Sequence, residues 1–299
     1  GPTAPAATDR PTRRVTATPE APRRGPALPG AVDWPKLAEV GTRTPRTTTA
    51  HFHVFAEDDQ DAVLAAAADR WAPEVEPLLA DVTDRLGGRG LPTAPVQLVF
   101  SRAYPARCPA RGLASTGHDP PLIMIFVDEA TPEVQVRAVL AHEITHHVTL
   151  DERFVGDGVL TEGIANWGAG RHMLAWQGIA SWDAAVRAYL RQGAYVSVAD
   201  ATALNPRPGE DCIARRDRVY NVRTAFVDWL ILRIGLARVL AMPYVEVETP
   251  GRDGAPPEVQ RVPDYAAGAG ADLAVLERIW LRDLAAPGRP EARAEIVHD

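Results

Sequence analysis

The sequence has few cysteines, no dense basic stripe and no long uninterrupted apolar run, and each of these absences excludes a class of protein. Two cysteines in 299 residues are too few for a scaffold held by several disulfides. The net charge is −7 and no dense basic stripe occurs, so we expect no nucleic-acid partner. The most apolar long stretch begins at Phe226 and contains Asp228, Arg233 and Arg238. That stretch indicates an amphipathic helix, and we expect no transmembrane segment.

The two cysteines, Cys108 and Cys212, lie far apart in the sequence. In an exported protein such a pair can close one disulfide. Two separate buried thiols are the alternative, and the sequence leaves both open.

The composition of the first 46 residues differs from that of the rest. Nine of the 27 prolines lie there, with Thr, Ala and Arg between them and little apolar periodicity, which is typical of a flexible, extended tether. A prosegment lying over an active site is the alternative. We expect an α+β catalytic lobe over residues 47–168 and a mostly helical C-terminal lobe over residues 169–299, with the active-site cleft between them.

Hydrophobic periodicity places the expected elements. Alternating or continuous apolar runs predict strands at 51–55, 96–100 and 122–127, which would form a small mixed sheet. Prolines and glycines between the second and third strands predict an irregular loop. Helical patterns cover residues 58–86, 131–150, 161–176, 181–191, 217–241 and 272–285.

The helix predicted for residues 131–150 carries His142-Glu143-Ile144-Thr145-His146. Residues four apart on a helix lie about 40° apart around the axis and about 6 Å apart along it. The imidazoles of His142 and His146 can therefore converge on one metal ion. Glu143 would stand beside the ion, where a carboxylate can take a proton from a coordinated water without being a ligand itself.

A third ligand is available sixteen residues after His146. Glu162 lies in Thr-Glu-Gly-Ile-Ala-Asn-Trp, at the predicted start of the next helix, which faces back towards the first. Two histidines and one glutamate leave a fourth position open for water, as in catalytic zinc sites, although other metals also use this set.

These motifs resemble those of the gluzincin metallopeptidases, the group that contains thermolysin and the M1 aminopeptidases, and more narrowly those of bacterial peptidase-MA-like domains. The likeness covers most of residues 50–286 and includes the segments AHFHVF, PVQLVF, VYNVRTAFVDWLILRIG and ADLAVLERIWLRDL. The resemblance implies one Zn²⁺ per chain, held by His142, His146 and Glu162, with Glu143 as general base and acid.

Further roles follow from the same resemblance. Asn166 lies where relatives often have a carboxylate that orients the first histidine, and an amide oxygen can accept the same hydrogen bond. Tyr220 would donate a hydrogen bond to the developing oxyanion, or else be a core aromatic. Arg223 would serve the same purpose or pair with Asp217 or Asp228.

The resemblance also implies a substrate-binding strand. In gluzincins the strand before the zinc helix is the edge along which an extended substrate pairs, here Leu122–Val127 with Ile123, Ile125 and Val127 on one face. Pairing through the main chain tolerates many side chains, which favours an endopeptidase. The Gly-x-Met-Glu-Asn type of signature of M1 aminopeptidases is absent from the sequence.

The other histidines carry weaker predictions. His147 points away from the two ligands, so we expect it to support them or to lie at the surface. His51 and His53 share one strand face, which is expected to be solvated, with metal binding as the alternative. His118 and His172 are candidates to line the cleft.

The sequence thus predicts a zinc-dependent peptidase that hydrolyses peptide or protein substrates through a zinc-bound water activated by Glu143. A catalytically weak gluzincin fold used for binding or regulation, and a zinc hydrolase of a non-peptide amide or ester, are the alternatives. Gly1-Pro2 is typical of the remainder of a cleaved tag, so we expect that a leader has been removed from an exported bacterial protein. The expected location is extracellular or at the cell surface.

Overall fold

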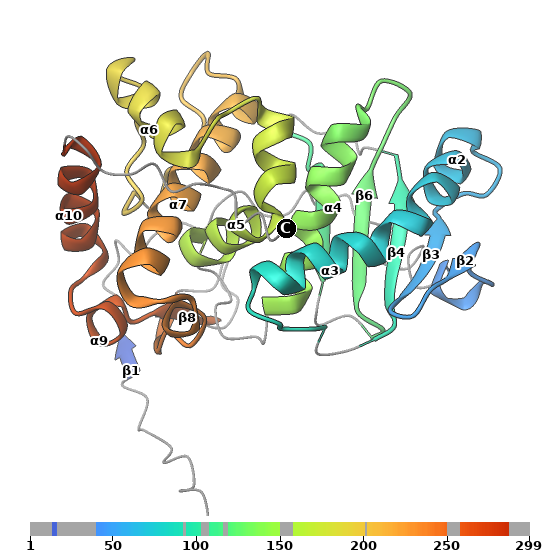
Figure 1. Cartoon of the computed structure of the whole chain (residues 1–299), viewed down its shortest axis with the longest axis horizontal. Coiled ribbons are helices and arrows are strands. Elements are labelled where there is room, and N and C mark those ends of the chain that lie inside the picture. Colours follow the sequence, from blue (N-terminus) through green and yellow to red (C-terminus); the bar gives the residue numbers. More distant parts are fainter. Residues whose placement is uncertain are drawn as a thin grey trace, which may run out of the picture.

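The computed structural model describes residues 14–16, 40–91, 94–102, 108–115, 119–149, 158–200, 202–249 and 258–286. The fold is α+β, as predicted, with a five-stranded mixed sheet at one end of the molecule and helices at the other (Figure 1). Within these residues, no helix is both long and apolar enough to span a membrane.

The sheet has the strand order β2-β3-β4-β6-β5. Strands β3, β4 and β6 run parallel to one another, and the two outer strands, β2 and β5, run antiparallel to their neighbours. Every residue of β4 and β6 is buried. Inner parallel strands are covered on both faces, which is why these two segments are mainly apolar in sequence. The strands are β2 Thr47–Thr48, β3 Phe52–Ala56, β4 Val96–Ser101, β5 Gly112–Ser115 and β6 Leu122–Phe126.

Strand β5 corrects two predictions. Gly112–Ser115 lies within the segment predicted to be an irregular loop, yet it pairs with β6, with Gly112 opposite Ile125. Strand β6 is therefore an inner strand, and the prediction that it forms the substrate-binding edge was wrong. Ile123, Ile125 and Val127 are at most 3% exposed and belong to the main core. A four-residue strand with a single large apolar residue, Leu113, has too little apolar alternation to be recognised from sequence.

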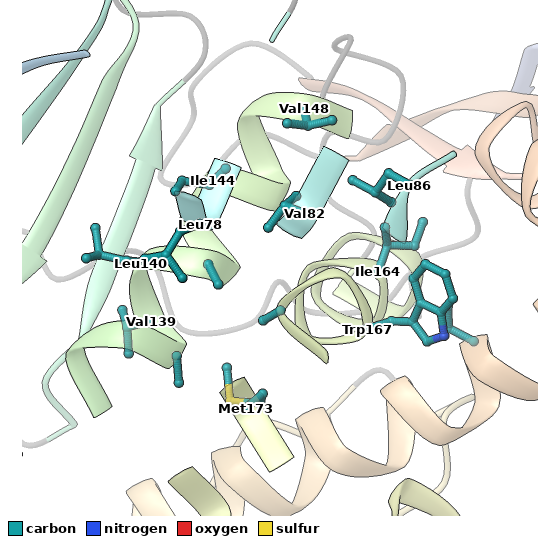
Figure 2. Close-up of a cluster of buried hydrophobic side chains, with 14 of the residues drawn as sticks. Leu78, Val82, Leu86, Val139, Leu140, Ile144, Val148, Ile164, Trp167 and Met173 are labelled. Atoms are coloured by element: carbon teal, nitrogen blue, oxygen red, sulfur yellow. The ribbon is translucent and has the colours of Figure 1, made fainter. Parts of the chain in front are cut away.

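Three helices of the first half cover the sheet. The predicted helix over residues 58–86 is divided into α2 Ala62–Trp71, a short 3₁₀ turn Ala72–Glu74 and α3 Val75–Arg85. The division falls at Pro73, which has no backbone N–H and so starts a new turn. Helix α4, Glu133–Thr149, follows β6 and packs against α3, β5 and β6. Figure 2 shows side chains of α3, α4 and α5 meeting in this core, among them Leu78, Leu140 and Ile164.

The second half is mainly helical. The predicted helix over residues 217–241 begins earlier, at Cys212, because Asp211 accepts hydrogen bonds from Ile213 N and Ala214 N as a cap. It ends at Gly235, whose φ of +87° suits glycine and breaks the helix. The helices are α5 Gly158–Gln177, α6 Trp182–Arg191, α7 Cys212–Ile234, α8 Leu236–Leu240, α9 Tyr265–Ala269 and α10 Leu273–Ala285.

A small second sheet was not predicted. Strands β7 Tyr244–Thr249 and β8 Glu258–Pro263 form an antiparallel pair, and β1 Arg14–Thr16 adds to β7 in parallel. Strand β1 lies within the predicted tether, most of which falls outside the described residues. The predicted lobe boundary at residue 168 falls inside α5, and the division into lobes stays a prediction.

Cys108 and Cys212 form a disulfide, with Cα atoms 5.8 Å apart. The bridge joins the segment before β5 to the first residue of α7, so it links the sheet to the helical half. The alternative of two separate thiols is excluded.

Candidate metal centre

Helix α4 carries the two histidines of the motif into the interior. Twelve of its seventeen residues are buried, because the sheet edge lies on one side and α5 on the other. His142, Glu143 and His146 are each 5–7% exposed. Burying ionisable side chains is costly unless they are paired or bind a metal, so these residues must pair with one another or hold an ion.

Glu162 supplies the third member of the cluster from the second turn of α5. Its Oε2 lies 3.3 Å from His142 Nε2 and 3.7 Å from His146 Nε2, and the two Nε2 atoms are 3.1 Å apart. Three potential ligand atoms therefore surround one point. This buried group can hold a metal ion.

The charges of the cluster interact strongly. Burial alone would raise the pKa of Glu162, but hydrogen bonds with His142 and His146 outweigh it and hold that pKa well below its usual value. Burial raises the pKa of Glu143, and the two imidazoles only partly oppose this. The cluster thus joins a firmly ionised carboxylate to one that takes up a proton readily, which is a suitable combination for binding a cation beside a base.

Asn166 fixes the orientation of the first histidine. It lies one turn after Glu162 on α5, is 1% exposed, and its Oδ1 is 2.7 Å from His142 Nδ1. An amide oxygen can only accept, so Nδ1 of His142 carries a hydrogen, and Nε2 is the ring nitrogen that faces Glu162 and is available to a metal. A histidine that binds a metal through Nε2 usually donates its Nδ1–H to such an acceptor, which fixes the orientation of the ring.

The carboxylate of Glu143 lies against β5. A Cβ atom placed on Gly112 would overlap Oε1 of Glu143 and lie 2.7 Å from Val139 Cγ1. Only a residue without a side chain lets the edge strand approach α4 this closely. Sequence reasoning missed Gly112, because a lone glycine between prolines gave no signal beyond that of a loop.

Tyr220 joins the cluster from α7. Its ring is parallel to that of His142, with an interplanar angle of 6° and centroids 6.3 Å apart. Burial, reinforced by the charge of Glu162, raises the pKa of the phenol, which is therefore protonated at neutral pH and able to donate a hydrogen bond. The structure places Tyr220 beside the predicted ligands, and its role in catalysis stays a prediction.

Two arginines link α7 to the segment before β5. Asp217 forms a two-point ion pair with Arg111, with N–O distances of 2.5 and 2.9 Å. Arg216, which sequence reasoning missed, donates from Nη1 to the carbonyl oxygen of Pro109 at 2.9 Å. Together with the disulfide, these contacts tie the segment that leads into β5 to α7.

The remaining histidines lie outside the cluster. His147 Nε2 is 2.9 Å from the carbonyl oxygen of Leu122, and burial lowers its pKa to about 4, so it supports β6 as a neutral donor. His172 contacts Asp81 at 3.0 Å, and His51 contacts Glu76 at 2.8 Å. His53 is half-buried on β3, and His118 lies outside the described residues.

Comparison of the chain with models of protein families, with curated proteins and with solved structures gave no match. The functional argument therefore depends on the site itself.

Proposed function

We propose that this protein is a zinc-dependent peptidase of the gluzincin type that cleaves within extended peptides. The observation that carries the proposal is the position of Glu143, a buried carboxylate beside three converging ligand atoms rather than among them. A purely structural metal site has no use for such a carboxylate, whereas metal-assisted hydrolysis needs one.

The separations of the ligand atoms support zinc. Bonds of about 2.0–2.1 Å in a tetrahedron put ligand atoms about 3.3–3.4 Å apart. The three separations between His142, His146 and Glu162 are 3.1, 3.3 and 3.7 Å. Zinc bound by these residues would polarise a substrate carbonyl and make water more acidic.

Glu143 would move the proton in this reaction. Its pKa is raised by burial, so the carboxylate can accept a proton from the attacking water and then release it to the leaving nitrogen. A group that serves as base and then as acid works best when its pKa lies close to the working pH.

Tyr220 would stabilise the charge that develops on the carbonyl oxygen. Its phenol is neutral and lies beside His142. A fixed donor aimed at a developing oxyanion typically contributes about 10²–10³ in rate.

Strand β5 would position the substrate, in place of the strand predicted from sequence. It is the last strand in the sheet order, and among the described residues nothing pairs with its outer edge. An extended peptide can add to such an edge through main-chain hydrogen bonds. Because Gly112 of this strand touches Glu143, a peptide paired there would lie beside the base.

The disulfide supports an exported location, because such bonds persist mainly in oxidising compartments. We therefore place the protein outside the cell or at its surface. Fractionation of producing cells, with alkylation of free thiols, tests this: an intracellular protein with both thiols free would contradict it.

Elemental analysis and one matched pair of variants test the proposed function. Purified protein should contain about one zinc per chain, and His146→Ala should lose it. Glu143→Gln should keep the metal and the fold but lose at least about 10²-fold in peptide hydrolysis. Metal with no hydrolysis in the unaltered protein would favour a binding module. Absence of metal even after zinc is offered at neutral pH would refute the proposal.

A further inference from the structure

Arg223 of α7 is a buried charge without an ion pair among the described residues. It is 7% exposed, and neither its Nε nor its Nη1 meets a hydrogen-bond acceptor there. Burying a charge is costly, and a guanidinium, which stays charged in proteins, cannot avoid that cost by losing a proton. A buried guanidinium with unused donors therefore points to a ligand that completes it.

The two acidic residues closest to Arg223 along α7 have other partners. Asp217 binds Arg111 through both carboxylate oxygens. Asp228 accepts a hydrogen bond from Trp167 Nε1 at 2.8 Å. The pairing of Arg223 with Asp217 or Asp228, which the sequence left open, is not formed.

The guanidinium of Arg223 lies close to the metal centre. Arg223 follows Tyr220 by one helical turn, and Tyr220 is stacked on His142. The Cζ atom of Arg223 would be 3.2 Å from a Cβ placed on Gly158, which precedes Glu162 by one turn of α5. The absence of a side chain at Gly158 leaves the space that the guanidinium fills. Arg223 thus lies between the helices that supply Tyr220 and Glu162.

We infer that Arg223 binds a carboxylate of the substrate close to the bond that is cleaved. This inference rests on the proposed function, because the anionic groups of an unmodified peptide are carboxylates. The planar guanidinium offers two parallel N–H donors, which match the two oxygens of a carboxylate. The carboxylate is either the C-terminus of a short peptide or the side chain of an Asp or Glu next to the scissile bond.

Binding of small metal-directed probes tests this inference without turnover. The probes are the monohydroxamates of succinic, glutaric and adipic acid, whose other end is a carboxylate, and the same compounds with a terminal amide. Calorimetry with zinc-loaded protein should show at least one acid binding about tenfold or more tightly than its amide. Equal affinities of acid and amide at every length would overturn the inference while leaving the metal centre in place.

Variants then assign the preference to Arg223. Arg223→Met should bring acid and amide to similar affinities, mainly by weakening the binding of the acid, and Arg223→Lys should keep part of the preference. Arg218→Met is the matched control, since Arg218 is on α7 but pairs with Glu210 at 3.1 Å; loss of the preference there would contradict the assignment. The comparison in unaltered protein needs no variant to fold. Absence of binding by every hydroxamate would remove the proposed function and this inference together.

Peptide cleavage distinguishes the two sources of the carboxylate. Random decapeptides with a free C-terminus and the same peptides as C-terminal amides are digested, and the cleavage sites are mapped by mass spectrometry. Cleavage close to the C-terminus that disappears on amidation identifies the terminal carboxylate. Cleavage next to Asp or Glu that survives amidation identifies the side chain. Sites distributed without regard to either carboxylate would overturn the inference.

Discussion

Removal of the disulfide between Cys108 and Cys212 should destabilise the protein strongly. The bridge closes a loop with a sequence separation of 104 residues. In the chain-entropy description, a closed loop of about 100 residues stabilises the folded state by about 4.7 kcal/mol at 25 °C, because it restricts the unfolded chain. Measured values commonly fall below this figure, so we expect a loss of about 2–5 kcal/mol in the free energy of unfolding.

The assay is urea unfolding of the oxidised protein and of the double variant Cys108→Ser, Cys212→Ser. Both are measured with a chelator present, so that metal binding does not contribute, and by circular dichroism and tryptophan fluorescence, whose coincidence checks the two-state assumption. Alkylation before unfolding confirms that the unaltered protein contains no free thiol. A difference below about 1 kcal/mol would refute the loop-entropy reasoning.

Three further variants probe the site. Gly112→Ala should lower activity at unchanged metal content, because the new Cβ displaces the carboxylate of Glu143; full activity would show that the strand yields instead. Asn166→Ala should weaken metal binding about 10–100-fold in a competition titration with a chelator, because His142 loses its orienting acceptor; an unchanged affinity would deny that role. Tyr220→Phe should lower kcat about 10²–10³-fold with little change in KM, as expected for a donor used in the transition state; an unchanged kcat would make Tyr220 a packing residue.

The residues of the metal centre could be predicted because the chemistry depends on local spacing. His142 and His146 are four residues apart on one helix, so helical geometry alone brings them together. Glu162 needed one more assumption, that the next helix returns to the first, and α5 does pack against α4. The central strands β4 and β6 were also predictable, since their sequences are mainly apolar.

The parts that escaped prediction depend on contacts between distant segments. Strand β5 is recognisable only beside β6, since its four residues, Gly-Leu-Ala-Ser, carry no pattern of their own. Tyr244–Thr249 does alternate between apolar and polar residues, but it forms a strand by pairing with β8, a separate segment of the chain. Whether Arg223 forms an ion pair depends on where Asp217 and Asp228 find their partners, which no local rule specifies.

Helix α7 and the segment before β5 are joined by three contacts beside the candidate metal centre. The Cys108–Cys212 disulfide, the Arg111–Asp217 ion pair and the bond from Arg216 to Pro109 all join them. The proposed substrate edge and the proposed oxyanion donor, Tyr220, therefore sit on connected elements, whereas the ligand atoms sit on α4 and α5. Because of this separation, we expect removal of the disulfide to lower the stability of the protein without changing any of the potential metal ligands. In the proposed reaction, these contacts would hold a peptide paired with β5 at a set distance from the phenol of Tyr220, and stabilisation of an oxyanion depends on such a distance.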